Sequence, residues 1–387
     1  MNIKKINLSL LFIFFTTFSV SAFDFHKLQN YFSLTGFVKK METVEIQNLQ
    51  GKWQTMTSAQ NRFDLRCYPT NSITAQIGMR NIFDYGQIPA ENYPEYIKIA
   101  TADNGFFDLT NCIAKDTSYV LYTNFDRAYI EFVKGSFDIV FGRQRINWGI
   151  NRVWNPNDIF NTFNYFNFDY LERPGCDGIK MQYYTGMTSS AQFGYKIDKE
   201  KNVTWASMFK FNKWSYDFQF LSGVMENDLV IGTGWSGQIF KAGFNGEISY
   251  FNNKDNLSDS TGLIVGSIGG NYGFEDGLFL QTAMIYNSKG TTGPAGCNNV
   301  EITAKNLTRA KYNLFGAASF PLTPLIKVEV SSMLNPTDKS YYIGPSFDLS
   351  LKQDLDLKIQ GQLYYGDDGT EFGDYGKVFY CRLKWSF

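Results

Sequence analysis

The sequence predicts an all-β fold, a transmembrane antiparallel β-barrel of about 16 to 18 strands with one inward-folded loop. Three observations lead to this prediction. The chain of 387 residues begins with an apolar export segment, alternates between apolar and polar residues over most of its length, and ends on an alternating segment whose last residue is aromatic. No later apolar run reaches the length of about 20 residues that a membrane-spanning helix needs.

The amino-terminal residues have the pattern of a secretory signal peptide. Two lysines precede an apolar run over 8–18, and small residues lead up to Ala22. This order of basic, apolar and small-residue regions is typical of a cleaved signal. The run is too short for a spanning helix, and no cysteine follows the cleavage point to carry a lipid anchor. We therefore expect residues 1–22 to direct Sec-type export and residues 23–387 to form the mature protein.

The mature chain alternates between apolar and polar residues in segments of about 8 to 12 residues, as half-buried strands do. In one of them, Leu355, Leu357 and Ile359 are separated by polar or charged residues. Charges at every second position are costly in a dry core, but they suit a water-facing side when the apolar side meets lipid. About 18 segments show this pattern, namely residues 32–44, 58–68, 72–82, 126–134, 136–143, 177–185, 189–197, 203–211, 214–223, 228–237, 240–251, 262–273, 277–287, 311–320, 325–333, 341–351, 354–365 and 376–387.

The connections between these segments alternate in length. Short turns follow the even-numbered segments, and longer loops tend to follow the odd-numbered ones, with the longest over 83–125, 144–176 and 288–310. Tight periplasmic turns opposite long outer loops are typical of transmembrane barrels, and a closed sheet forms one unit. We therefore expect a single domain over 23–387, with both chain ends on the periplasmic side.

Composition and charge argue against several classes of function. The formal net charge is −1, whereas a face that binds nucleic acid is basic. The single histidine, His26, closely follows the export segment, so a His-dependent hydrolase in the barrel wall is not expected. No Gly-rich phosphate loop and no convincing helix is recognisable. The sequence therefore predicts no enzyme, no nucleic-acid partner and no cofactor.

The five cysteines are an odd number for an exported chain. Cys67 and Cys381 fall in or beside predicted strands, whereas Cys112, Cys176 and Cys297 fall in predicted loops. One disulfide among the loop cysteines stays open at this point, because connectivity does not follow from sequence alone. The spacing of the cysteines does not indicate a metal site.

The last eleven residues form the clearest predicted strand. Leu383, Trp385 and Phe387 lie on one apolar face, and Arg382 and Lys384 lie on the opposite face. This ending resembles the carboxyl-terminal signal of bacterial outer-membrane proteins. The resemblance implies insertion into the lipid bilayer of the cell outer membrane with the help of the barrel-assembly machinery.

The region around 144–176 breaks the alternation and is rich in charges, tryptophan and asparagine. A loop of this length in a compact fold is usually functional. Arginines bind anions through forked hydrogen bonds, opposed carboxylates create a field across a lumen, and tryptophans stack on sugars. The candidate constriction residues are Arg143, Arg145, Trp148, Arg152, Trp154, Asp158, Glu172, Arg173 and Asp177. The alternative is that these charges pair with each other and fix the loop to the wall.

Three short motifs in this region carry a resemblance to a known family. Gly-Arg-Gln-x-x-Asn-Trp-Gly begins at Gly142, Asn-Pro-x-Asp at Asn155, and Arg-Pro-Gly-x-Asp at Arg173. The set is similar to the corresponding stretch of porin-like families in Gram-negative outer membranes. The resemblance implies a loop that folds into the lumen and sets its constriction, and it implies a homotrimer as one assembly.

Further charges are expected on the lumen wall from the period of two. They are Arg382, Lys384, Lys358, Lys180, Asp354 and Asp356. Both signs occur, so strong ion selectivity does not follow from the wall alone. The resulting hypothesis is a porin, a channel for passive diffusion of small hydrophilic solutes. Two alternatives stay open: a barrel whose outer loops, with Phe106, Phe107 and 288–310, dock a partner or surface polymer, and an export channel for an anionic polysaccharide.

Overall fold

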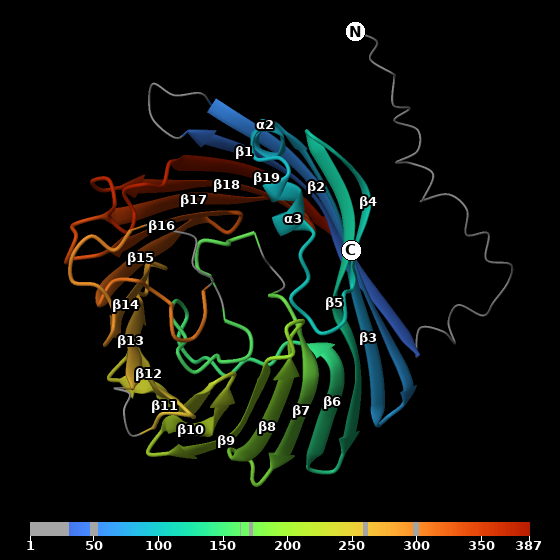
Figure 1. Ribbon diagram of the computed structural model, residues 1–387, viewed down its shortest axis with the longest axis vertical. Coiled ribbons are helices and arrows are strands. Elements are labelled where there is room, and N and C mark those ends of the chain that lie inside the picture. Colours follow the sequence, from blue (N-terminus) through green and yellow to red (C-terminus); the bar gives the residue numbers. More distant parts are fainter. Residues whose placement is uncertain (1–30, 47–52, 163, 170–172, 258–261, 297–301) are drawn as a thin grey trace, which may run out of the picture.

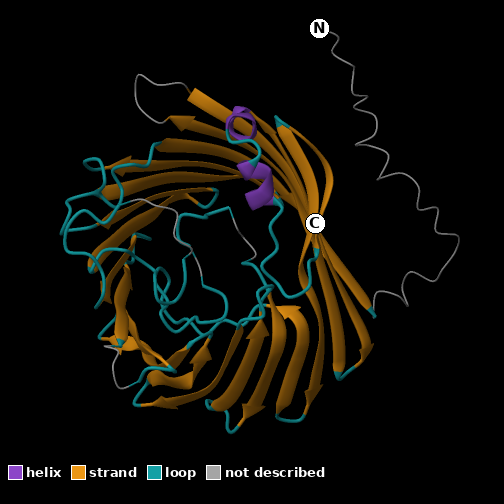
Figure 2. Ribbon diagram, viewed as in Figure 1, coloured by secondary structure: helices purple, strands orange, loops and turns teal. Residues whose placement is uncertain are grey.

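The computed structural model of the chain describes residues 31–46, 53–162, 164–169, 173–257, 262–296 and 302–387. The predicted export segment, His26, Glu172 and Cys297 lie outside these residues. Within them the chain forms one 19-stranded sheet with antiparallel neighbours, and the sheet curves into a ring (Figure 1). Figure 2 shows that strands make up almost the whole wall.

The strands follow one another around the ring in chain order. They are β1 (Phe32–Ile46), β2 (Trp53–Thr70), β3 (Ile73–Gly86), β4 (Thr110–Asp116), β5 (Tyr119–Lys134), β6 (Phe137–Gln144), β7 (Cys176–Tyr184), β8 (Ser190–Ile197), β9 (Val203–Lys213), β10 (Tyr216–Met225), β11 (Asp228–Ile239), β12 (Ala242–Asn253), β13 (Leu263–Gly273), β14 (Phe279–Asn287), β15 (Tyr312–Thr323), β16 (Ile326–Leu334), β17 (Tyr341–Lys352), β18 (Leu355–Tyr365) and β19 (Lys377–Ser386). β1 pairs with β2 on one side and with β19 on the other, which closes the barrel. Closure matters because an open sheet edge in lipid would leave backbone groups without partners.

The short strand β4 is an addition to the ring. β3 pairs directly with β5 from one end to the other, and β4 pairs with the first residues of β5, next to the segment that pairs with β6. The other 18 strands form the barrel, and each of them overlaps one predicted segment, although β2 and β5 begin earlier than predicted. The predicted fold class, a transmembrane antiparallel barrel, is therefore confirmed.

The two faces of the wall differ as the alternation predicts. The side chains of Leu383 and Trp385 on β19, and of Phe387 directly after it, are exposed on the outside, whereas Arg382 is buried on the inside. The barrel therefore presents apolar side chains outward and polar ones inward, which is the arrangement that lipid outside and water inside require. Among the described residues no helix has the length and apolar character needed to cross a membrane.

Glycine is needed at two places near the loop that enters the barrel. Gly135 has a φ of 59° and makes the tight turn between β5 and β6. Gly142 has a φ of 120° on β6, and a Cβ there would lie only 2.3 Å from the carbonyl oxygen of Ala128. A side chain at this position would clash with β5, which explains the first residue of the Gly-Arg-Gln motif.

The predicted 83–125 loop contains structure that the sequence did not indicate. It holds the helices α2 (Gln87–Glu91) and α3 (Glu95–Ala100), the strand β4, and the start of β5. The expectation of no helix was therefore wrong, because helices of one or two turns are too short to show a helical period. Cys112 and Cys176 also lie on strands, β4 and β7, and not in loops, and both are free thiols.

Candidate functional site

The loop between β6 and β7 lies inside the ring, where its green trace crosses the interior in Figure 1. It is held on opposite parts of the wall. Its first limb, which contains Ile150 to Asn157, bonds to Glu247 on β12. Its second limb, residues 164–169, accepts a hydrogen bond from Gln362 on β18 through the carbonyl of Phe166 (2.7 Å). We call this segment, residues 145–175, the lumen loop.

A single buried carboxylate anchors the first limb. Glu247 points inward from β12, and one of its oxygens accepts the backbone N–H groups of Ile150 and Asn151, the latter at 2.7 Å. Its other oxygen accepts the backbone N–H of Asn157 at 2.9 Å. A buried carboxylate is tolerated only when hydrogen bonds replace its water, and here three loop amides do so.

The Asn-Pro-x-Asp motif forms part of the same attachment. The side-chain amide of Asn157 donates to the carbonyl of Thr233 at 3.0 Å, and the hydroxyl of Ser249 donates to the carbonyl of Pro156 at 2.9 Å. The hydroxyl of Ser267 donates to the carbonyl of Trp154 at 2.9 Å. Neighbouring strands therefore hold consecutive peptide groups of the loop, so this motif positions the backbone.

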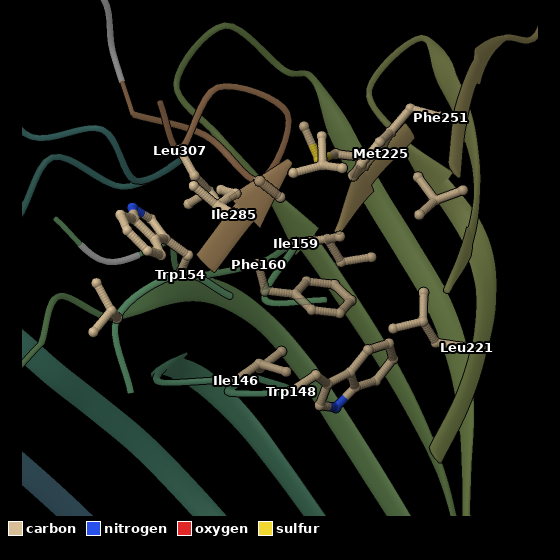
Figure 3. Packing of buried hydrophobic residues seen from close by; sticks show 14 of the residues in the cluster. Ile146, Trp148, Trp154, Ile159, Phe160, Leu221, Met225, Phe251, Ile285 and Leu307 are labelled. Carbon is tan, nitrogen blue, oxygen red and sulfur yellow. The ribbon is translucent and has the colours of Figure 1, made fainter. Parts of the chain in front are cut away.

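The aromatic residues of the lumen loop pack against the inner wall. Trp148 is 1% exposed and meets the ring of Phe160 edge-on at 4.8 Å, and Trp154 is 5% exposed and meets Phe315 at 6.4 Å (Figure 3). Both rings belong to an apolar cluster built with inward side chains such as Leu221. Neither tryptophan offers a face for stacking on a sugar, contrary to the interpretation from sequence.

Asp158 is fully buried beneath the loop. Its carboxylate accepts the backbone N–H of Trp148 at 3.4 Å. Burial raises the pKa of Asp158 to about 7, although Arg145 and Arg173 act in the opposite direction. This residue therefore supports the loop from within and is not exposed to the lumen.

The second limb reaches the seam where the barrel closes. Asp169 contacts Lys39 of β1 at 2.5 Å and Arg382 of β19 at 3.4 Å. Phe168 packs on Tyr380 of β19, with ring centroids 4.6 Å apart. The lumen loop therefore joins the first and the last strand of the ring in addition to the opposite wall.

Arg143 and Asp177 form a structural ion pair at the base of the lumen loop. The guanidinium of Arg143 donates to both oxygens of Asp177, at 2.8 and 2.9 Å, and to Asp103 at 2.7 Å. Burial alone would raise the pKa of Asp103, but the Arg143 bond and the backbone N–H groups of Gly105 and Leu109 leave it below its usual value. The pair thus ties the segment after α3 to the ends of β6 and β7.

The remaining arginines line a cavity of about 630 Å³ beside the lumen loop. Its wall combines loop residues with inward side chains of β14 to β19. Among the described residues, the charged side chains that line it are Arg145, Arg152, Arg173, Lys358, Arg382 and Glu329. Burial and then the nearby charge of Arg145 lower the pKa of Arg173. The cavity is therefore markedly basic.

The predicted wall residues fall into three groups. Lys358 pairs with Asp348 at 3.0 Å, and Lys180 pairs with Asp138 at 3.3 Å, so both point inward. Lys384 lies over the ring of the buried Phe37 at 5.3 Å. Two acids lie at the end of the barrel: Asp356 accepts the hydroxyl of Ser350 at 3.1 Å, and Asp354 occupies the β17–β18 turn and not the wall.

Sequence analysis missed the residues that hold the lumen loop, namely Glu247, Lys39 and Asp169. Glu247 carried a weak signal, because it is the single charged residue on the otherwise uncharged strand β12. Lys39 and Asp169 are 130 positions apart, and only the closed ring brings them together. Glu172 lies outside the described residues.

Comparison with known proteins supports the barrel fold. No protein-family model matches the chain, and no curated relative matches it. OccAB1 of Acinetobacter baumannii has a TM-score of 0.58 at 9% identity, covering 92% of this chain and 96% of that one. OprD of Pseudomonas aeruginosa has a TM-score of 0.59 at 8% identity, covering 92% and 95%.

Similarity at such low identity concerns the fold alone. The OprD structure is described as an outer membrane protein, and its barrel corresponds to this one over nearly the whole described chain. The apolar exterior and the closed ring agree with that environment. The chain is therefore a closed antiparallel β-barrel with an apolar exterior, and it shares its fold with OprD and OccAB1.

Proposed function

We propose that this barrel is a porin, a channel for passive diffusion of small hydrophilic solutes, and that the lumen loop narrows it. The observation that carries the proposal is the attachment of the loop to opposite sides of the ring, at Glu247 and at Lys39 with Arg382. A loop fixed on both sides subdivides the lumen and leaves a solute a restricted path.

The basic cavity suggests which solutes pass best. Its volume of about 630 Å³ is within the range of sites for small molecules. Arg152 is exposed beside Phe279, with its guanidinium 5.4 Å from the ring centre, and Arg145 and Arg173 are partly exposed. Guanidinium groups at a constriction favour anions by charge and by forked hydrogen bonds. We infer a preference for small anionic solutes over cations of similar size.

Part of the basic charge is already compensated. Asp348 faces Lys358, and Asp169 faces Arg382. We infer that the exposed guanidinium of Arg152 contributes more to the selectivity of the channel than these wall cations do. Arg152 is one of the arginines that the forked-hydrogen-bond argument from sequence names.

Conductance of the purified protein in a planar bilayer tests the proposal. We expect steady open channels, and we expect a shortened variant without residues 164–169 to conduct more because the second limb no longer crosses the lumen. The matched control removes the same number of residues from the outer 288–310 loop. A correctly folded barrel that stays silent would contradict the porin proposal and favour a closed barrel that docks a partner. An unchanged conductance after shortening would contradict the role of the loop.

A further inference from the structure

A smaller cavity lies at the end of the barrel that carries the long loops, which in a transmembrane barrel is the outer end. Its volume is about 310 Å³, and its wall is formed by β1, β2, β18 and β19, which are neighbours in the ring (Figure 1). Ile88 of α2 and Tyr375, from the loop between β18 and β19, also line it. This cavity, which we call the tyrosine cavity, shares no lining residue with the basic cavity.

Three tyrosines give the tyrosine cavity an aromatic wall. Tyr364 and Tyr380 line it from the strands, and Tyr375 lines it from the loop. The ring centroids of Tyr364 and Tyr375 lie 5.0 Å apart, and the two rings are inclined at 37°. Met41 and Met56 add two thioethers, which are polarizable and adapt to the shape of a ligand. Such a wall suits a ligand whose surface is largely made of methyl groups.

Two polar groups of this wall are left without partners. Glu45 is the only charged side chain among the described residues that line the tyrosine cavity. It is partly exposed, and within the described part of the chain it makes no hydrogen bond or ion pair. The side chain of Thr43, two positions away on β1, is 4% exposed, and its hydroxyl has no hydrogen-bond partner among the described residues. Because buried polar groups are nearly always paired, these two groups indicate a place for a ligand.

A single carboxylate beside tyrosine rings favours an organic cation over other ligands. The faces of aromatic rings attract cations, and the carboxylate of Glu45 adds an opposite charge. A metal ion takes several oxygen ligands, and in the described ranges no group of three His, Cys, Asp or Glu side chains could supply them. An anion would be repelled by Glu45, because no basic side chain among the described lining residues opposes it.

The hydrogen-bond acceptors of the cavity indicate which kind of cation fits. A primary ammonium brings three N–H donors that need acceptors, whereas a quaternary ammonium brings none. The side-chain oxygen of Gln362 already accepts the hydroxyls of Tyr380 at 3.2 Å and of Tyr364 at 3.4 Å, so it offers little to a further donor. We infer that the tyrosine cavity binds a small quaternary ammonium compound, with its methyl groups on the tyrosine rings and its charge beside Glu45. This inference goes beyond the proposed transport function and does not depend on it, because a barrel closed to solutes can still bind a ligand at its outer end.

Calorimetric titration of the purified full chain in detergent tests the need for a quaternary ammonium without any variant. The probes are choline, its uncharged analogue dimethylbutanol, in which carbon replaces the nitrogen, and ethanolamine, which has a primary ammonium. We expect choline to bind and dimethylbutanol to bind about tenfold more weakly, because the rings and Glu45 attract only the charged compound. We expect ethanolamine also to bind more weakly than choline. Absence of choline binding, or binding of either other compound as tightly as choline, would overturn the inference.

Variants then test whether choline binds in the tyrosine cavity. Glu45→Gln should weaken choline binding about fivefold or more, since a nearby unit charge is lost, whereas Glu275→Gln, at an exposed carboxylate in the turn between β13 and β14, should not. Tyr375→Leu should weaken binding, and Tyr375→Phe, which keeps the ring, should bind choline like wild type.

Altered migration of unheated samples in gels reports a closed barrel for each variant. If Glu45→Gln and Tyr375→Leu are closed barrels and bind choline like wild type, the tyrosine cavity is not the site and the inference fails. If a variant does not fold, the comparison of choline with dimethylbutanol on wild type still decides whether the protein recognises a quaternary ammonium.

Discussion

The two faces of the lumen loop differ in what they contact, although they come from the same short stretch of sequence. Trp148 and Trp154 turn toward the wall and are buried, whereas Arg145 and Arg152 line the basic cavity. The wall face is fixed by apolar packing and backbone hydrogen bonds, and the cavity face is the one that solute would meet under the proposed function. Mutations on the first face should therefore act on loop position, and mutations on the second on selectivity.

Removal of the Glu247 carboxylate should have the largest effect. Glu247→Ala leaves three loop N–H groups without their acceptor, two of them buried, and each buried loss costs about 1–3 kcal/mol. We expect the first limb to detach and single-channel conductance to rise. Glu275→Ala, which removes an exposed carboxylate from the turn between β13 and β14, is the matched control and should leave the conductance level nearly unchanged. If Glu247→Ala folds and conducts like wild type, the wall face does not hold the loop.

Truncation of the buried tryptophan should come next. Trp148→Ala removes a ring packed on Phe160, at a cost of roughly 3–5 kcal/mol. We expect a lower unfolding temperature and noisier channels with the ion selectivity of wild type. Trp205→Ala, at an exposed outward position of β9, is the control for loss of an aromatic ring. A reversal potential that shifts as much as in the arginine variants would show that Trp148 faces the solute.

Arginines in the cavity and at the base of the lumen loop should separate effects on ion selectivity from effects on structure. Arg152→Ala and Arg145→Ala should shift reversal potentials toward cations. A unit charge about 4 Å away is worth about 1 kcal/mol in bulk water, which corresponds to roughly a fivefold change. Arg143→Ala instead breaks the bonds to Asp177 and Asp103, so it should expose the 103–109 segment to protease without a comparable shift. Equal shifts of the reversal potential for the Arg143 and Arg152 variants would remove the distinction between the base of the loop and the cavity.

Asp158 should make the stability of the docked loop modestly dependent on pH. Burial raises the pKa of Asp158 to about 7, so the docked loop binds its proton more tightly than the unfolded chain does. The stabilisation is complete below the ordinary pKa of about 4 and is lost as the pH rises through about 7. Thermal unfolding at about pH 5 and about pH 8 should show a more stable loop at the lower pH. Asp158→Asn should reduce the difference in unfolding temperature between the two pH values. An unchanged difference in this variant would contradict the assignment of the pH dependence to Asp158.

The ring could be predicted from the sequence because each ring strand has one face toward lipid and one face toward the lumen. Apolar residues such as Leu383 are favoured on the first face and polar residues such as Arg382 on the second, which produces the period of two. The lumen loop has no such rule, since its residues are sorted by contacts with distant strands. Trp148 and Arg152 are both plausible at a constriction, and only the position of β12 and the Glu247 carboxylate shows which of them faces the wall.

Asp169 contacts the first strand of the ring through Lys39 and the last through Arg382. Lys39 and Arg382 come together only when β1 pairs with β19. Asp169 can therefore make both contacts only at the final stage of assembly. In a chain whose barrel has not yet closed, the second limb would stay undocked and accessible to protease. Protection of the second limb from protease would then report the closure of the barrel.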